Sequence, residues 1–588
     1  MPEPTSLRPH RPRRALLALA LALAPACGDD GDATGASAGD TSSSTGATTD
    51  ATATTAAEST TGADTGGDAD LLSAPEHLIR VAMALRGMRP SEADLAAVEA
   101  DPAALPAIVD AYLDTPEFGA TVREVYNDAF LSLIDFALPP GGFLPKGPVA
   151  GADPYALNRA IMEAPLRLVE HVVMDDRPLT EIVTADYTYA SPEVAAVWGL
   201  DHGGGGWQEV PVAGKRTAAG VLSDSWLWTR HSSTITNANR GRASAMARAL
   251  LCHDFLDREI SIDTNINLAD PNVVAKAVEE NPSCAACHQT LDPLASFFSG
   301  YLPNFAPALL DYPIETWVPG LFDVLFKVNL RDPAYYGAPG DDLRDLGEMI
   351  ADDPRFSLCA ARRFYAHLHQ LPVEEVSAAD AADAQALLLG ADMRVKALVK
   401  ELVLADEFRR RSGDLNPKRA RPGQLARLID DLTGFRWRTD LSLYGVGVID
   451  LMDDSLIGFQ VLGGGIDSYY VTRPAYPYNA TASLVLQGLA RTAANYVVES
   501  DLGQADPKKR VLLTKIATGQ TDEPSVRAQL ASIFRRLYGD ALAADDPQIT
   551  AAYQLFAAAL AGAPLKNPKI AWKITLTALL QDHRIAFY

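Results

Sequence analysis

The sequence predicts a mainly α protein of several multi-helix domains, with a small irregular, β-containing insert in its C-terminal part. Apolar residues recur at helical spacing over most of the chain after residue 70, as Leu78, Val81, Ala82 and Leu85 do. Capping residues and prolines stand where such stripes begin, and glycines often stand where they end. Runs of β-branched and aromatic residues, which favour strands, are confined to short stretches.

Residues 1–27 form a targeting segment and take no part in the fold. Four arginines precede a run of Ala and Leu at residues 15–24, which is too short to span a bilayer. The stretch that ends at Cys27 resembles a bacterial lipoprotein signal, in which the cysteine becomes the lipidated first residue. The resemblance implies an exported protein, lipid-anchored to the bacterial cell envelope in the periplasm or on the outer surface. An ordinary secretory signal cut near Ala26 is the alternative.

Residues 28–70 are a low-complexity segment with nine acidic residues and no basic ones. This composition cannot bury enough apolar surface to fold, so a disordered acidic linker is predicted. A flexible tether of this length spans roughly 35–40 Å on average. Such a tether would keep the folded domains at a distance from a membrane surface. A spacer without a function fits the composition equally well.

An N-terminal helical domain is predicted for residues 71–200. Ser73 to Glu76 has the form of a capping box, and the helix that follows it ends before Gly87. Residues 182–189 are rich in Ile, Val, Thr and Tyr and are expected to be extended. The further helices of this domain are predicted over residues 91–101, 105–113, 121–133 and 158–174.

A second domain is predicted over residues 201–412 and a C-terminal helical domain over residues 413–588. In the C-terminal domain, residues 443–470 are the irregular and β-favouring insert, and long amphipathic helices follow from residue 483. The helices of the second domain are predicted over residues 242–256, 343–350, 359–368 and 380–403.

The chain has 75 acidic residues against 51 Lys and Arg, which gives a formal net charge of −24. No basic stretch offsets this balance, and the composition therefore argues against a nucleic-acid partner. An acidic balance otherwise indicates a solvated surface and points to no particular ligand.

The segment 281–293 contains the pattern C-x-x-C-H, formed by Cys284, Cys287 and His288, which is typical of c-type haem attachment. The spacing places both thiols on one side of a helical turn, as two thioether bonds to one porphyrin require. His288 can then bind the haem iron as its proximal ligand. We therefore predict covalently attached haem c as the cofactor. A Cys284–Cys287 disulfide or dithiol and a zinc site are the alternatives.

Four residues are candidates for a second, distal iron ligand. Met349 lies far enough after the C-x-x-C-H pattern for its sulfur to bind the iron on the side of the haem opposite to His288. The competing interpretation is a core methionine on the helix predicted at 343–350. His253, His367 and His369 are weaker candidates, and an open position on the iron would suit the binding of small molecules.

Cys252 and Cys359 are the cysteines that remain when Cys27 is lipidated and the C-x-x-C-H thiols hold haem. An exported protein enters an oxidising compartment, so a Cys252–Cys359 disulfide is predicted. Closing a loop of about 100 residues stabilises a fold by up to about 4.7 kcal/mol in the chain-entropy model. Two separate buried thiols are the alternative.

Several segments together resemble the planctomycete-type cytochrome c-like proteins, which are built from adjoining domains of unknown function. The block 281–293 is the most specific of these segments, while residues 294–299 depart from the family pattern. The resemblance covers about residues 74–411 and implies an exported cytochrome-like protein without indicating a substrate. The other segments that carry it are residues 184–189, 198–200, 216–222, 239–241, 250–252, 353–359 and 406–411.

The leading hypothesis is an exported lipoprotein with a covalent c-type haem that acts in electron transfer, with an unknown redox partner, or in redox sensing. The alternative is a non-enzymatic, disulfide-stapled envelope protein that binds a polymer or a protein partner. Whether the chain is an enzyme stays open, although the hydrolase patterns G-x-S-x-G and H-E-x-x-H are absent from the sequence.

Overall fold

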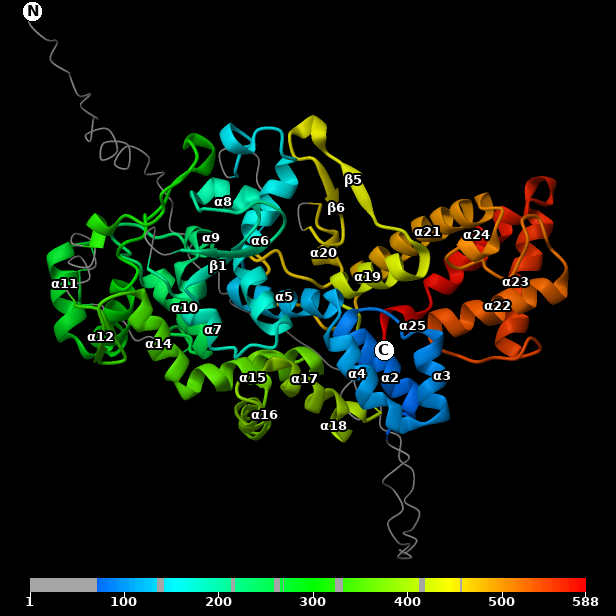
Figure 1. The fold of residues 1–588 in the computed structure, drawn as a ribbon, viewed down its shortest axis with the longest axis horizontal. Coiled ribbons are helices and arrows are strands. Elements are labelled where there is room, and N and C mark those ends of the chain that lie inside the picture. Colours follow the sequence, from blue (N-terminus) through cyan, green and yellow to red (C-terminus); the bar gives the residue numbers. More distant parts are fainter. Residues whose placement is uncertain are drawn as a thin grey trace, which may run out of the picture. The chain divides into compact units, whose positions relative to one another are not determined.

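The computed structural model describes residues 71–134, 142–212, 217–257, 265–267, 269–322, 331–411, 418–454 and 457–588. Within these residues the fold is mainly helical, and strands occur only as two-stranded antiparallel pairs (Figure 1). The predicted fold class is therefore confirmed. The predicted signal segment 1–27, with Cys27, and the predicted linker 28–70 lie outside the described residues.

The N-terminal part is made of helices α2 (Ala74–Arg86), α3 (Glu92–Ala100), α4 (Leu105–Leu113), α5 (Pro116–Phe130) and α6 (Pro154–Met174). Helix α2 begins as predicted, because the Ser73 N–H donates to Glu76 Oε2 at 2.8 Å. It ends at Gly87, whose φ of 65° lies in the left-handed region. A Cβ on Gly87 would lie 2.7 Å from Gln424 Cα, so the glycine also allows the C-terminal part to approach α2.

The described residues in the middle of the chain contain four short strands, of which β1 pairs with β2 and β3 with β4. Residues 181–184 form a helical turn, although the sequence analysis expected residues 182–189 to be extended. Ile182 and Val183 are fully buried in this turn, and packing against α14 overrides their preference for strands. The elements are α7 (Glu181–Thr184), β1 (Tyr187–Ala190), α8 (Pro192–Trp198), β2 (Gln208–Pro211), α9 (Ser225–Arg230), α10 (Arg240–Leu251), α11 (Pro271–Glu280), α12 (Pro282–Ser296), β3 (Ala334–Tyr335), β4 (Ala338–Pro339), α14 (Leu343–Asp352), α15 (Pro354–His369), α16 (Ala378–Gly390), α17 (Val395–Leu404) and α18 (Asp406–Arg409).

The C-terminal part combines one hairpin with long helices. The hairpin pairs Arg438 with Asp450 and overlaps the predicted insert 443–470, which also contains the short helix α20. The elements are α19 (Pro422–Thr433), β5 (Arg438–Asp440), β6 (Val448–Asp450), α20 (Phe459–Leu462), α21 (Ala480–Gly503), α22 (Glu523–Tyr538), α23 (Pro547–Gly562), α24 (Pro568–Leu580) and α25 (His583–Ala586). Short 3₁₀ turns occur at Pro102–Ala104, Gly147–Val149, Gly220–Ser223, Pro307–Leu309, Pro319–Leu321, Val373–Glu375, Ser442–Tyr444, Pro507–Lys509 and Pro564–Lys566.

Two large hydrophobic cores organise the described residues. The first runs from Leu78 to Phe408 and includes residues on both sides of the predicted boundary at 200, which stays a prediction. The second is formed by α19 and the C-terminal helices. Helix α2 contributes to both cores, since Leu78 is buried in the first and Met83 in the second.

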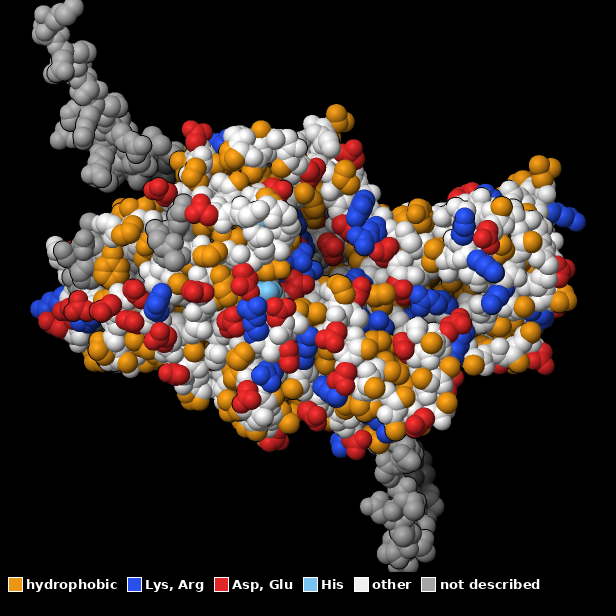
Figure 2. All heavy atoms as spheres, in the orientation of Figure 1, with side chains coloured by type: hydrophobic (Ala, Val, Ile, Leu, Met, Phe, Trp, Pro, Cys, Tyr) orange, Lys and Arg blue, Asp and Glu red, His pale blue; other side chains and the backbone are white. Residues whose placement is uncertain are grey.

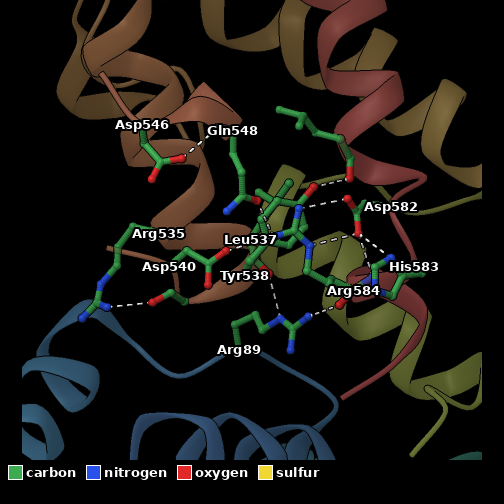
Figure 3. A network of polar contacts seen from close by, with 12 residues as sticks. Arg89, Arg535, Leu537, Tyr538, Asp540, Asp546, Gln548, Asp582, His583 and Arg584 are labelled. Carbon is green, nitrogen blue, oxygen red and sulfur yellow. Dashed lines mark hydrogen bonds and ion pairs between the residues drawn. The ribbon is translucent and has the colours of Figure 1, made fainter. Parts of the chain in front are cut away.

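A polar network joins the segment after α2 to the C-terminal helices (Figure 3). The buried Arg89 donates from Nε to the Leu537 carbonyl at 2.9 Å and from Nη2 to the Arg584 carbonyl. Arg584 in turn forms ion pairs with Asp540 at 2.9 Å and with Asp582 at 3.0 Å. The network therefore links the N-terminal helices to α22 and α25.

Among the described helices, none is both long enough and apolar enough to cross a membrane.

Candidate functional site

The C-x-x-C-H pattern lies near the start of α12, which packs against α11 and α10 (Figure 1). The Asn281 side chain caps the helix by accepting a hydrogen bond from the Ser283 N–H at 3.0 Å. Pro282 lies in the first turn of the helix, where backbone N–H groups have no partner within the helix, so the absence of an N–H on proline costs no hydrogen bond. Cys284 and Cys287 are both partly exposed, and their three-residue spacing puts them on the same side of the helix.

His288 is oriented by a carboxylate one turn later on the same helix. Its Nδ1 lies 2.9 Å from Oδ1 of Asp292, and the Asp292 side chain is fully buried. Arg240, the first residue of α10, reaches the same carboxylate with two bonds, from Nε to Oδ1 at 2.6 Å and from Nη2 to Oδ2 at 3.0 Å. The three side chains form a chain of contacts that ties α12 to α10.

The charge state of Asp292 follows from these neighbours. Burial alone would raise the pKa of this carboxyl, but the hydrogen bonds from His288 and Arg240 and the charge of Arg240 hold its pKa below the usual value. An ionised carboxylate only accepts hydrogen bonds, so the contact with His288 puts the imidazole proton on Nδ1. The Nε2 atom of the neutral ring then keeps its lone pair and can bind a metal or accept a proton.

Asp292 and Arg240 were not among the site residues predicted from the sequence. The contact between His288 and Asp292 could have been predicted from the sequence, because residues four apart on a helix are neighbours on its surface. For Arg240 no local signal existed, since 52 residues separate it from Asp292. Only the packing of α10 on α12 brings the guanidinium to the carboxylate.

The structure contains the Cys252–Cys359 disulfide that the sequence predicted, with the two Cα atoms 5.3 Å apart. Cys252 caps the end of α10, and Cys359 lies on α15. The segment that follows Cys252 reaches the C-x-x-C-H helix, because Cys287 Sγ lies 4.0 Å from the Phe255 carbonyl oxygen. The disulfide therefore ties the end of α10 to α15, and the segment that contacts α12 begins at this same end of α10. The structure does not join Cys284 to Cys287.

The candidates for a distal iron ligand lie in different places. Met349 lies next to Gly340, close to the ring of Phe297, which follows the end of α12 opposite to His288. A Cβ built on Gly340 would lie 2.7 Å from the Met349 methyl group. His367 contacts Arg421 at 2.9 Å, and His369 stacks on Tyr365 with ring centroids 4.2 Å apart. None of these three residues is placed against His288.

His253 is the remaining distal candidate. It lies on the segment next to α12, with its ring 4.7 Å from that of Phe255, whose carbonyl oxygen is near Cys287. Of the four residues proposed from the sequence, it is therefore the one that the structure brings to the neighbourhood of the motif.

The prediction that the protein is metal-binding is wrong for the part of the chain that the structure describes. No group of three or more His, Cys, Asp and Glu side chains in these residues could hold a metal ion. Cys284, Cys287 and His288 on α12 do not form such a group. Among the described residues, this finding contradicts the zinc alternative, and it shows no haem-binding group either.

Comparisons of the chain with family models, with curated proteins and with solved structures find no match.

Proposed function

We propose that the chain is an exported, lipid-anchored protein of the cell envelope that carries haem c on Cys284 and Cys287 and acts in electron transfer or redox sensing. The observation that carries this proposal is the His288–Asp292 hydrogen bond next to two partly exposed thiols on the same helix. Haem c is attached to the protein by two thioether bonds, and four porphyrin nitrogens coordinate its iron. The iron therefore does not need a cluster of protein ligands to be held.

The residues of α12 fit the requirements of this group. Cys284 and Cys287 would form the two thioether bonds, and His288 would offer its Nε2 atom to the iron. Asp292 holds the imidazole ring in place and keeps the proton on Nδ1, as partners behind metal-binding histidines commonly do. When bound, the haem supplies a one-electron redox centre.

The other parts of the proposal rest on the sequence and on the disulfide. The stretch ending at Cys27 supports export and lipidation, and the Cys252–Cys359 bond agrees with an oxidising compartment. The similarity to the planctomycete-type cytochrome c-like proteins supports a cytochrome-like role, with a redox partner still to be found.

An absorption spectrum of protein exported from a host with haem-attachment machinery tests the proposal. We expect a c-type Soret band and α band, and a denatured protein that keeps haem in a stained gel because the bond is covalent. A Cys284→Ala/Cys287→Ala double variant should lose both signals. A Cys252→Ala/Cys359→Ala variant is the matched control, since it also removes two cysteines but should keep the haem.

A colourless protein with an intact Cys252–Cys359 bond would contradict the proposal. It would favour the alternative function, a non-enzymatic envelope protein that binds a polymer or a protein partner. The disulfide is compatible with either function, so the spectrum rather than the fold decides between them.

A further inference from the structure

A cleft away from α12 is lined by residues from both hydrophobic cores. Helices α5 and α6 form one wall, and the start of α19 with parts of the segment 435–466 forms the other. Figure 2 shows a hollow in this part of the visible face, with basic and acidic side chains around it. The cavity measures about 360 Å³ and shares no residue with α12. Its size falls in the range of small-molecule sites, and such sites often lie between domains.

The walls of this α5–α19 cleft are polar and balanced in charge. Among the described residues, six arginines and six carboxylates line it. Three ion pairs cross or line it: Arg421 with Asp128 at 2.6 Å, Arg427 with Glu124 at 2.7 Å, and Arg159 with Glu163 at 2.7 Å. Each of these guanidinium groups is therefore neutralised by a carboxylate, and the cleft offers no net charge to a ligand.

This balance selects against strongly charged ligands. An anion that approached Arg421 would be repelled by the neighbouring Asp128. A cation that approached Asp128 would likewise be repelled by Arg421. In both cases the repulsion offsets the attraction. A neutral ligand with many hydroxyl groups has no such conflict, because each hydroxyl can donate to a carboxylate and accept from a guanidinium.

Two residues that line the cleft each have a side-chain atom without a hydrogen-bond partner, one an acceptor and one a donor. Within the described residues, Glu124 Oε2 and Arg427 Nη2 are buried and have no hydrogen-bond partner. The two atoms belong to the same ion pair, in which only Oε1 and Nη1 meet. A hydroxyl group both donates and accepts hydrogen bonds, so it can satisfy an acceptor and a donor of this kind.

An aromatic side chain completes the lining. Trp437 lies at the cleft and is partly exposed. Its ring packs against Phe459, with ring centroids 4.7 Å apart, and close to Gly488, where a Cβ would lie 3.1 Å from the indole. A fixed indole gives a flat apolar surface next to polar groups, which matches the C–H face and hydroxyl edge of a sugar ring.

We propose that the α5–α19 cleft binds a neutral saccharide, as a monosaccharide unit or the end of a longer glycan. This site is additional to the proposed haem site and independent of it. Glycan binding through this cleft would not depend on whether haem is attached to α12.

Binding of neutral glycans to the full mature chain tests the proposal. Maltotriose, cellotriose, mannotriose and chitotriose, together with an array of neutral glycans, are screened by saturation-transfer NMR and titration calorimetry. Inorganic phosphate and a trimer of galacturonic acid serve as charged comparison probes. We expect at least one neutral glycan to bind, and to bind more tightly than either charged probe.

Two variants locate the site without removing a charged pair. Trp437→Ala removes the aromatic surface, and Ala426→Trp fills the cleft from α19; each should weaken binding at least tenfold. Tyr444→Ala is the matched control, because Tyr444 is 69% exposed and lies outside the cleft lining, and it should change the affinity less than twofold. Thermal unfolding of each variant establishes that it is folded.

The proposal is overturned if no neutral glycan binds to the wild-type chain, or if a charged probe binds more tightly than every neutral one. It is equally overturned if the folded Trp437→Ala and Ala426→Trp variants both keep wild-type affinity, since the glycan would then bind elsewhere. These results are independent of the haem spectrum.

Discussion

Asp292 is the residue on which the local structure around His288 depends. Its fully buried carboxylate accepts hydrogen bonds from His288 and Arg240. In an Asp292→Asn variant the Arg240 guanidinium would lose its ionised partner, and we expect the free energy of unfolding to fall by about 2–3 kcal/mol. Urea unfolding of the haem-free protein measures this change.

The exposed pair Lys276–Glu280 on the neighbouring helix provides a control for Asp292. Glu280→Gln should change the free energy of unfolding by less than about 0.5 kcal/mol, because exposed ion pairs contribute little. If both variants lost the same small amount, Asp292 would have no special part in holding α12 to α10.

His369 makes the stability of the fold dependent on pH. Its side chain is buried, and burial, together with the charges of Lys418 and Arg80, lowers its pKa to about 3. Below pH 6.5 the unfolded chain binds a proton at this position that the folded chain does not, so stability falls as the pH drops from 6.5 towards 3. Lowering the pH from 7 to 5 should cost about 2 kcal/mol from this residue alone.

The dependence on His369 is measured by urea unfolding at pH 7 and pH 5. A His369→Gln variant should lose less stability between the two pH values than the wild-type chain. His583→Gln is the control, because the His583 side chain is 79% exposed and is not part of the buried core. An unchanged pH dependence in His369→Gln would contradict the assignment.

At the scale of the elements, the Cys252–Cys359 disulfide connects the end of α10 to α15 across a sequence separation of 107 residues. Replacing both cysteines by alanine should lower the free energy of unfolding by about 4 kcal/mol, because the unfolded chain regains the freedom of a long loop. Thermal and urea unfolding measure the loss.

Cys284→Ala is the control for the disulfide variant, and it should leave stability within about 1 kcal/mol of the wild-type value. Labelling of Cys252 or Cys359 in the denatured, unreduced protein would show that the bond is absent.

Helix α14 approaches α7 so closely that only glycine fits at position 347. A Cβ there would lie 2.2 Å from the Val183 carbonyl oxygen. Alanine is a better helix former than glycine by about 1 kcal/mol, yet Gly347→Ala should destabilise the protein by about 1–3 kcal/mol through this overlap. Gly390→Ala on α16 is the control, since no atom beyond its chain neighbours and the backbone of its own helix lies within 4 Å of the new methyl group. A gain of up to about 1 kcal/mol is expected. Differential scanning fluorimetry compares the two, and a stabilised Gly347→Ala protein would contradict the contact.

At the scale of the whole molecule, Arg89 joins the N-terminal helices to the C-terminal core (Figure 3). Its guanidinium is buried and donates to two backbone carbonyls from α22 and α25, which would lose their donor in an Arg89→Met variant. We expect a loss of about 3 kcal/mol and a broader or two-step unfolding curve, because the two cores would lose part of their coupling.

Calorimetry of the Arg89→Met protein distinguishes one transition from two. Arg473→Met is the matched control, because the Arg473 side chain is 80% exposed and its ion pair with Glu374 lies on the surface. A single sharp transition at the wild-type temperature in Arg89→Met would show that the two cores are coupled by other contacts.

The sequence by itself determined the fold class, the beginnings of many helices and the disulfide partners. Helix periodicity and caps are local properties, so Ser73 and Gly87 mark the ends of α2 without knowledge of the rest of the fold. The cysteine pairing was predicted by assigning Cys27 to a lipid anchor and Cys284 and Cys287 to haem, which left Cys252 and Cys359 to pair. Residues 181–184 show the limit of this reasoning, because burial against α14 decided their conformation rather than their own preference.

Only the tertiary structure decided what surrounds the functional side chains. Arg240 reaches Asp292 across 52 residues of sequence, and Arg421 reaches Asp128 across 293 residues. The same holds for Met349, which the sequence allowed as an iron ligand and which the fold packs beside Phe297. Contacts of this kind depend on how whole helices pack, and no pattern within a single helix encodes which distant partner its polar face will meet.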